Sequence, residues 1–314
     1  MNAIKILGRT IEHPIMNAAG TCKTVEDVSK IAKSASAAIM VGSVTTKPRT
    51  VNNIGNVFHS NPEYALNSLG MPNPGLEWYK SQLPSMATIA TGAGKPLFVS
   101  VAGFSPAEYA QLGYEVLLAG AHGVELNLGC PNIWDSSQQK KIPSFDPCLL
   151  AEILETASGY ISKFGIKLSP YSDPALLSEV ASVIGSYIAV DYVATSNTFP
   201  NTLAFDKKGN HMVHAPFAGM SGPAMKPIAL GQVRQFCDAL PSTVEVVGVG
   251  GVANGADVLD YLRAGAATVQ MATAYLKTTR TAVFSEILSE YIGIISQRPT
   301  VVSMGGQHSL TGQS

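Results

Sequence analysis

The sequence contains few charged residues and no long apolar run. Charged residues make up 14% of the 314 positions and the net charge is −1. Long-range attraction to nucleic acid or to an anionic membrane is therefore not expected. No apolar run reaches the roughly 18 residues that a membrane-spanning helix needs. Charged residues also interrupt the N-terminal segment, so neither a secretory signal nor a membrane anchor is expected.

Cysteine is equally scarce, and no sequence signal for a metal site is present. Cys22, Cys130, Cys148 and Cys237 are widely separated, form no CxxC pair, and the six histidines show no metal-ligand spacing. We therefore expect no zinc site and no disulfide framework. This cysteine usage is typical of a reducing compartment and predicts a cytoplasmic protein.

Domain boundaries are also missing, because no Gly/Ser-rich linker interrupts the chain. We expect a single domain over residues 1–314. The Gly- and Ser-rich tail at 304–314 is predicted to be mobile.

What the sequence does contain is a regular alternation of short apolar runs and helix-length amphipathic segments. Most of the runs are continuously apolar, which is typical of parallel strands buried on both faces. The alternation predicts an α/β protein with a (β/α)8 (TIM) barrel, and a doubly wound open sheet is the alternative. The eight predicted strands lie at 15–19, 37–44, 96–103, 123–129, 165–170, 189–197, 244–251 and 268–275.

Several helices have recognisable ends. Ser105 and Pro106 provide an N-cap and a first helical residue, and Gly265 is suited to end a helix that begins near Asn254. The segment 47–95 is too long for a simple connection in a barrel. We expect it to form a lid or wall over the C-terminal face of the strands, where barrel active sites lie.

A glycine-rich turn follows the seventh predicted strand. Gly248, Gly250 and Gly251 precede the helix that begins near Asn254, and backbone N–H groups at such a helix start can bind phosphate. A dinucleotide fold would place an acid at the end of the next strand, but none occurs at 268–275. The pattern therefore favours a barrel phosphate site, with a tight turn that binds no ligand as the alternative.

Cys130 and Lys167 are the strongest candidates for chemistry. Pro131 holds Cys130 in an extended conformation at a predicted strand end, although a lone cysteine can also be simple core filler. Lys167 lies inside an apolar strand, where an unpaired charge would be costly unless a bound anion or electron-rich ring offset it. For Lys47, a surface position is as well supported as a site position.

Several motifs together resemble the class 1 dihydroorotate dehydrogenases over roughly residues 4 to 290. They occur in that family's order, which makes them more specific than any one alone. The motifs are MNAAG at 16–20, NSLGMPN at 67–73, NLGCPN at 127–132, GIKLSP at 165–170, SGPAMKPIAL at 221–230 and the glycine turn at 248–251.

The resemblance implies a barrel that holds FMN at its C-terminal mouth and oxidises dihydroorotate to orotate in pyrimidine biosynthesis. A hydride would leave C6 of the substrate for flavin N5, and Cys130 would take the proton from C5. With a thiol pKa of about 8.5, unless the site shifts it, activity should rise with pH. A homodimer is implied as well.

The resemblance also implies two groups of binding residues. The substrate group is Asn67, Leu69, Gly70, Met71, Asn127, Asn132, Asn197 and Thr198. The FMN group is Ala18, Ala19, Gly20, Ser43, Asn127, Lys167, Asn197, Gly222, Gly250, Gly251, Ala272 and Thr273.

Four departures from the family pattern stand out. Gly42 occupies the position of a lysine that usually touches flavin and substrate, Gly129 replaces a serine, and Ala272 replaces a glycine. The loop at 133–146 lacks the short motif of the homodimeric, fumarate-using subclass. NSLGMPN favours that subclass, whereas SGPAMKP favours the one that uses NAD through an iron–sulfur partner. Fumarate is the expected acceptor and NAD the alternative.

Two other functions stay open from the sequence. One is a flavin- or orotate-binding barrel with lost or altered activity, which Gly42, Gly129 and the 133–146 loop suggest. The other is a tRNA dihydrouridine synthase, whose cysteine motif resembles NLGCP at 127–131. The near-neutral charge and the absence of an added helical domain disfavour the second.

Overall fold

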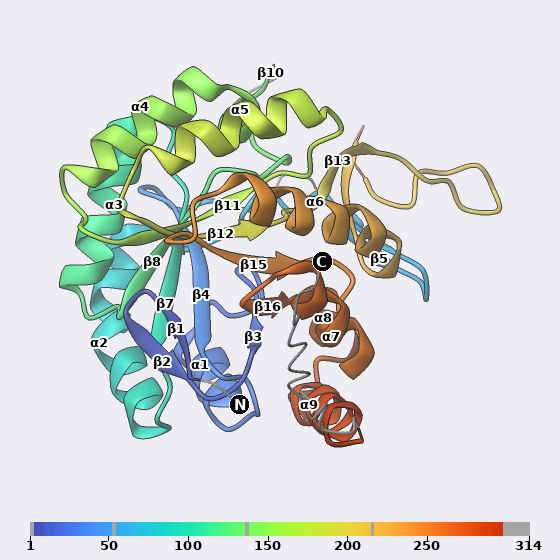
Figure 1. Cartoon of the computed structure of the whole chain (residues 1–314). Coiled ribbons are helices and arrows are strands. Elements are labelled where there is room, and N and C mark those ends of the chain that lie inside the picture. Colours follow the sequence, from blue (N-terminus) through green and yellow to red (C-terminus); the bar gives the residue numbers. More distant parts are fainter. Residues whose placement is uncertain (1–2, 52–54, 136–137, 215–216, 298–314) are drawn as a thin grey trace, which may run out of the picture.

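Eight parallel strands form the centre of the protein in this computed structural model (Figure 1). It describes residues 3–51, 55–135, 138–214 and 217–297, so the predicted mobile tail lies outside the described residues. The strands are β3 (Ile15–Asn17), β4 (Ile39–Val44), β7 (Leu97–Val101), β8 (Gly123–Asn127), β11 (Phe164–Leu168), β12 (Val190–Thr195), β15 (Glu245–Val249) and β16 (Thr268–Met271).

The strand order follows the chain around the sheet, and β16 then pairs with β3. This is the predicted (β/α)8 barrel, and the open-sheet alternative is wrong. Helices that follow one another along the chain pack side by side as an outer ring (Figure 1). They are α1 (Val25–Ala32), α2 (Leu76–Gly92), α3 (Pro106–Leu118), α4 (Pro147–Ser158), α5 (Pro174–Gly185), α6 (Lys226–Ala239), α7 (Gly255–Ala264), α8 (Thr273–Thr278) and α9 (Ala282–Ser296).

Local sequence signals explain where these elements begin and end. Every residue of β4 and β8 is buried, as expected for strands covered on both faces. Ser105 accepts a hydrogen bond from the Glu108 N–H and starts α3. Gly265 ends α7 at φ 114°, in the left-handed region that favours glycine. The predicted caps are confirmed.

A side chain closes the seam between β3 and β4. The Asn17 amide donates to the Met40 carbonyl at 2.8 Å and accepts from the Met40 N–H at 2.9 Å. An asparagine amide carries one donor face and one acceptor face, so it replaces a peptide group of a neighbouring strand. The N–H of Gly20 extends the seam by donating to the Gly42 carbonyl.

The N-terminal end of the barrel is plugged. A hairpin of β1 (Ile4–Ile6) and β2 (Arg9–Ile11) turns at Leu7, which lies in one buried cluster with Phe98 and Tyr192. The Leu7 N–H donates to the Asp191 carboxylate. Because the interior is filled at this end, a ligand has room at the opposite, C-terminal end.

A small antiparallel sheet forms a wall beside that C-terminal end. It combines β5 (Phe58–Ser60) and β6 (Ala65–Asn67) with β13 (Phe199–Thr202) and β14 (Ala218–Ser221), and β6 pairs with β14. Figure 1 shows β5 and β13 on the same side of the barrel. The segment 47–95 thus supplies the predicted wall and, in addition, helix α2. Within the described residues, no helix is both long and apolar enough to cross a membrane.

Candidate active site

Two adjoining cavities lie where the barrel strands end. The glycine cavity, of about 210 Å³, is lined by Gly222, Gly250 and Gly251. The thiol cavity, of about 150 Å³, is lined by Cys130 and by Asn127. Because the two share seven lining residues, they form one continuous site. The shared residues are Ala19, Lys167, Asn197, Thr198, Ser221, Ala272 and Thr273.

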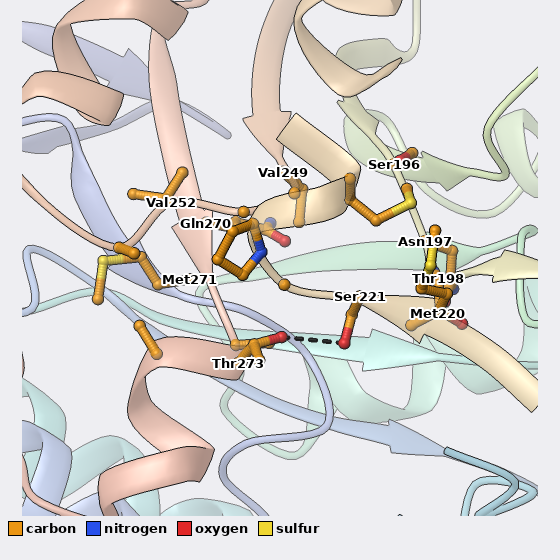
Figure 2. A pocket seen from close by; sticks show the side chains of 18 of the residues that line it. Ser196, Asn197, Thr198, Met220, Ser221, Val249, Val252, Gln270, Met271 and Thr273 are labelled. Atoms are coloured by element: carbon orange, nitrogen blue, oxygen red, sulfur yellow. Dashed lines mark hydrogen bonds between the residues drawn. The ribbon is translucent and has the colours of Figure 1, made fainter. Parts of the chain in front are cut away.

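The glycine cavity is enclosed by loops that approach closely. Gly222, Gly250 and Gly251 have φ values of 92°, 134° and 71°. A Cβ on Gly251 would lie 2.9 Å from the Gly222 carbonyl oxygen. Figure 2 shows the cavity, with the Thr273 and Ser221 hydroxyls joined across it at 3.0 Å. These loops present backbone rather than side chains to a ligand.

A buried polar network lies beneath the junction of the two cavities. Lys167 is 5% exposed, and its ammonium donates to Gln270 Oε1 at 3.1 Å. Gln270 in turn donates to Glu125 Oε2 at 2.7 Å, and the Tyr192 hydroxyl donates to the same oxygen at 2.9 Å. Burial lowers the pKa of Lys167, and the negative charge of Glu125 partly offsets this.

Four asparagines from different segments converge on the thiol cavity. Asn197 donates to Asn127 Oδ1 at 3.0 Å, and Asn127 donates to the Ser43 hydroxyl at 2.9 Å. Asn132 donates to Asn67 Oδ1 at 3.0 Å. Amides offer donors and acceptors side by side, so this lining suits a planar heterocycle with amide edges.

Cys130 borders the thiol cavity with a partly exposed side chain. Desolvation by its surroundings raises the pKa of the thiol from 9.0 to about 11, although the Asn132 N–H and Arg49 act in the opposite direction. The site therefore shifts the pKa upward from the ordinary value of a thiol. A thiol with this pKa is protonated at neutral pH and becomes a strong base when it ionises.

The structure brings together nearly all of the predicted binding residues. With the exception of Ala18, each lines at least one of the two cavities. Ala18 is buried and donates its N–H to the Met271 carbonyl, so it supports the β3–β16 pairing. Lys47 is exposed and lines neither cavity, so the possibility that it reaches the site is wrong.

The departures from the family pattern have structural causes. Gly42 has φ 102°, and a Cβ there would lie 2.4 Å from the Ser100 carbonyl oxygen. A Cβ on Gly129 would lie 2.5 Å from the backbone of Leu168. Neither backbone position can accept a larger residue without moving. Ala272, by contrast, lines both cavities with its methyl group.

Lys23 also lines the thiol cavity and was not selected from the sequence. Lys23 does not end a strand, so the strand-end criterion passed over it. The signal that could have identified Lys23 was its place in the β3–α1 connection, on the C-terminal side of the barrel. Among the described residues, no three His, Cys, Asp or Glu side chains gather closely enough to hold a metal ion.

A glycine-lined cavity joined to a cavity with a thiol and amides defines a class of barrel enzyme that holds a phosphate-bearing cofactor beside a small polar substrate. A family model described as dihydroorotate dehydrogenase matches residues 1–294. The chain belongs to the dihydroorotate dehydrogenase family, and it is thereby an oxidoreductase.

Individual relatives agree with this assignment. The chain is 31% identical to dihydroorotate dehydrogenase (fumarate) of Kluyveromyces lactis, over 94% of this chain and 93% of the relative. It is 30% identical to dihydroorotate dehydrogenase A (fumarate) of Lactococcus lactis subsp. cremoris, over 91% of each. The crystal structure of DHODH in complex with ferulenol from Eimeria tenella has the same fold, with a TM-score of 0.79 and 19% identity over 94% of this chain and 84% of that one.

The residues present fit the flavin that this family uses. The Ser196 hydroxyl is buried at the glycine cavity and has no hydrogen-bond partner in the part of the chain that the structure describes. Buried polar groups rarely stay unpaired, so a bound ligand is the expected partner. The three glycines would admit a phosphate group, and the Lys167 ammonium lies where the cavity meets the thiol side.

Proposed function

We propose that the chain, as one FMN-binding barrel domain over residues 1–314, oxidises dihydroorotate to orotate with Cys130 as the base. The observation that carries this proposal is the position of the thiol, in a cavity continuous with the glycine cavity. A planar substrate in the thiol cavity would face Cys130 on one side and the cofactor on the other. FMN, when bound, would supply the acceptor for the hydride from C6.

The side chains of the thiol cavity have two proposed roles, which are proton removal and binding of the substrate ring. The Cys130 thiolate takes the proton from C5, so the substrate loses one hydride and one proton in forming the C5–C6 double bond. Asn67, Asn127, Asn132 and Asn197 bind the amide edges of the ring. Their mutual hydrogen bonds hold them in place before the substrate arrives, which reduces the entropy lost on binding.

Lys167 is proposed to contact the flavin ring system. Its ammonium is buried, its pKa is lowered by burial, and the side chain borders both cavities. A cation held there would stabilise negative charge that develops on a neighbouring ring. Glu125 and Gln270 position this ammonium from below.

The test is an anaerobic titration of the purified protein with dihydroorotate, followed through the flavin absorbance. The wild-type protein should bleach with one equivalent of dihydroorotate, whereas Cys130→Ala should stay coloured and folded but bleach at least about 100-fold more slowly. Cys148→Ala, at an exposed position on α4, is the matched control. Orotate binding without bleaching in the wild type would favour the barrel with lost or altered activity.

Fumarate is the proposed electron acceptor, and NAD through an iron–sulfur partner is the alternative. The names of the two relatives carry the word fumarate, which supports the first. Reoxidation of the bleached protein with fumarate, NAD or a quinone in separate cuvettes distinguishes them. Rapid recovery of colour with fumarate supports the proposal, and recovery with another acceptor alone contradicts it.

A homodimer and a cytoplasmic location are proposed as well. Leu203, Phe205 and Phe217 are exposed on the segment that connects β13 and β14, and a partner copy could cover them. All four cysteines are unpaired, as in most cytoplasmic proteins. Light scattering of the purified protein at several concentrations tests the dimer, and a mass of one chain throughout contradicts it. The family match leaves no support for a tRNA dihydrouridine synthase.

A further inference from the structure

Lys23 lies in the connection between β3 and α1 and borders the thiol cavity together with Cys130. The side chain is half-buried, and its ammonium donates to the Pro72 carbonyl at 2.9 Å. Pro72 also lines this cavity. A lysine ammonium has three donors. The contact with Pro72 uses one of them and holds the charge at the cavity wall.

The backbone around Lys23 is held by the start of α1. Asp27 accepts from the N–H of Lys23 and from the N–H of Thr24, both at 3.0 Å, in a capping box. Its carboxylate is therefore already engaged in hydrogen bonds at the start of α1. No described carboxylate forms an ion pair with the Lys23 ammonium. Burial lowers the pKa of Lys23, with Asp27 acting in the opposite direction.

The neighbouring cations are engaged elsewhere. Arg49 donates through Nε to the Gly70 carbonyl at 3.0 Å, and its guanidinium lies 5.3 Å from the centre of the Phe104 ring. Lys167 contacts Gln270 at the junction with the glycine cavity. The strand end at Gly42 cannot carry a side chain with this backbone. Of the two lysines that line the thiol cavity, Lys23 is the one that does not also line the glycine cavity.

We propose that Lys23 binds the carboxylate of dihydroorotate and orotate and thereby selects an anionic pyrimidine over a neutral one. This inference rests on the proposed function. A partly desolvated ammonium without a carboxylate partner gains most from a ligand that brings the negative charge with it. Lys23 is thus a specificity residue, distinct in its role from the base at Cys130.

Lys23 should act on binding and not on proton removal. The Asn132 N–H and Arg49 are the groups that lower the pKa of Cys130, whereas the ammonium of Lys23 is held at the Pro72 carbonyl. Loss of the Lys23 charge should therefore raise KM and leave the pKa in the kcat/KM profile unchanged. A residue that only supported the fold would show no preference for charged ligands.

The experiment compares orotate with orotamide, a neutral ligand of almost the same shape. Dissociation constants are measured on the flavin-loaded protein through the change in flavin absorbance. For Lys23→Met and Lys23→Gln, orotate affinity should fall about 10- to 100-fold while orotamide affinity changes less than about threefold. Lys23→Arg should retain part of the preference. Lys30→Met, an exposed position on the adjoining helix α1, is the control.

Three results would overturn the inference. They are unchanged orotate affinity in Lys23→Met, equal loss for orotate and orotamide, and loss of folding or flavin content in every Lys23 variant including arginine. If the wild-type protein binds neither ligand, the proposed function fails and the role of Lys23 fails with it, whereas normal orotate binding in Lys23→Met contradicts the role of Lys23 alone. Selective loss of orotate binding supports the inference even if the electron acceptor is not fumarate.

Discussion

The pH dependence of the reaction should report the environment of Cys130. Burial raises the pKa of this thiol from 9.0 to about 11. Below that pKa the thiolate fraction rises tenfold per pH unit, so kcat/KM should increase about 1,000-fold between about pH 6.5 and about pH 9.5. A thiol without the shift would level off near pH 9, so at neutral pH the site holds about 100-fold less thiolate than an exposed thiol would provide.

The assay is the anaerobic rate of flavin bleaching at low dihydroorotate, because kcat/KM follows ionisation in the free enzyme. Cys148→Ala should give the wild-type profile. Cys130→Ala should be slow and should lose the slope. A plateau beginning near pH 8 in the wild type would refute the raised pKa. An unchanged slope in Cys130→Ala would refute the assignment of the base.

Three further changes test the fold and the cofactor site. Asn17→Leu leaves β4 peptide groups unpaired and should lower the free energy of unfolding in urea by about 2–5 kcal/mol; a loss below about 0.5 kcal/mol would contradict seam closure by Asn17. Gly251→Ala should greatly reduce the flavin retained on gel filtration, since its Cβ meets a carbonyl oxygen at 2.9 Å; equal flavin content in Gly251→Ala and the exposed helical control Gly231→Ala would contradict this. Glu125→Gln removes the charge that raises the pKa of Lys167 and should cost about 3 kcal/mol at pH 7. A buried lysine with a lowered pKa sheds its proton as pH rises, so part of that loss should return near pH 10, and an equal loss at both pH values would contradict the coupling.

Much of the fold was predictable because its signals are local. Continuous apolar runs identified all eight barrel strands, and Ser105 and Gly265 marked helix ends as observed. Many of the residues that line the two cavities were also selected from the sequence, since a barrel collects the ends of its strands at one face. For Lys47 the sequence left a surface position and a site position open, and the structure shows the lysine exposed.

Other features depend on segments that are distant in the sequence. Asn17 closes the seam because β4 passes beside it, and no local pattern marks that role. From the sequence alone, Gly42 is the loss of a lysine that the family usually has at this position. In the structure it is a close approach to Ser100 that excludes any side chain. The Lys23 ammonium is held by the carbonyl of Pro72, in the connection between β6 and α2.

The sequence alone determined the barrel, its active face and the thiol at the end of β8. Hydrophobic periodicity, helix caps and motifs each depend on residues that are close together along the chain. Tertiary structure alone decided the direction of the pKa shift of that thiol, the closure of the seam and the position of Lys23 at the thiol cavity. Desolvation and charge interactions depend on distances between atoms far apart along the chain, and folding is what sets those distances.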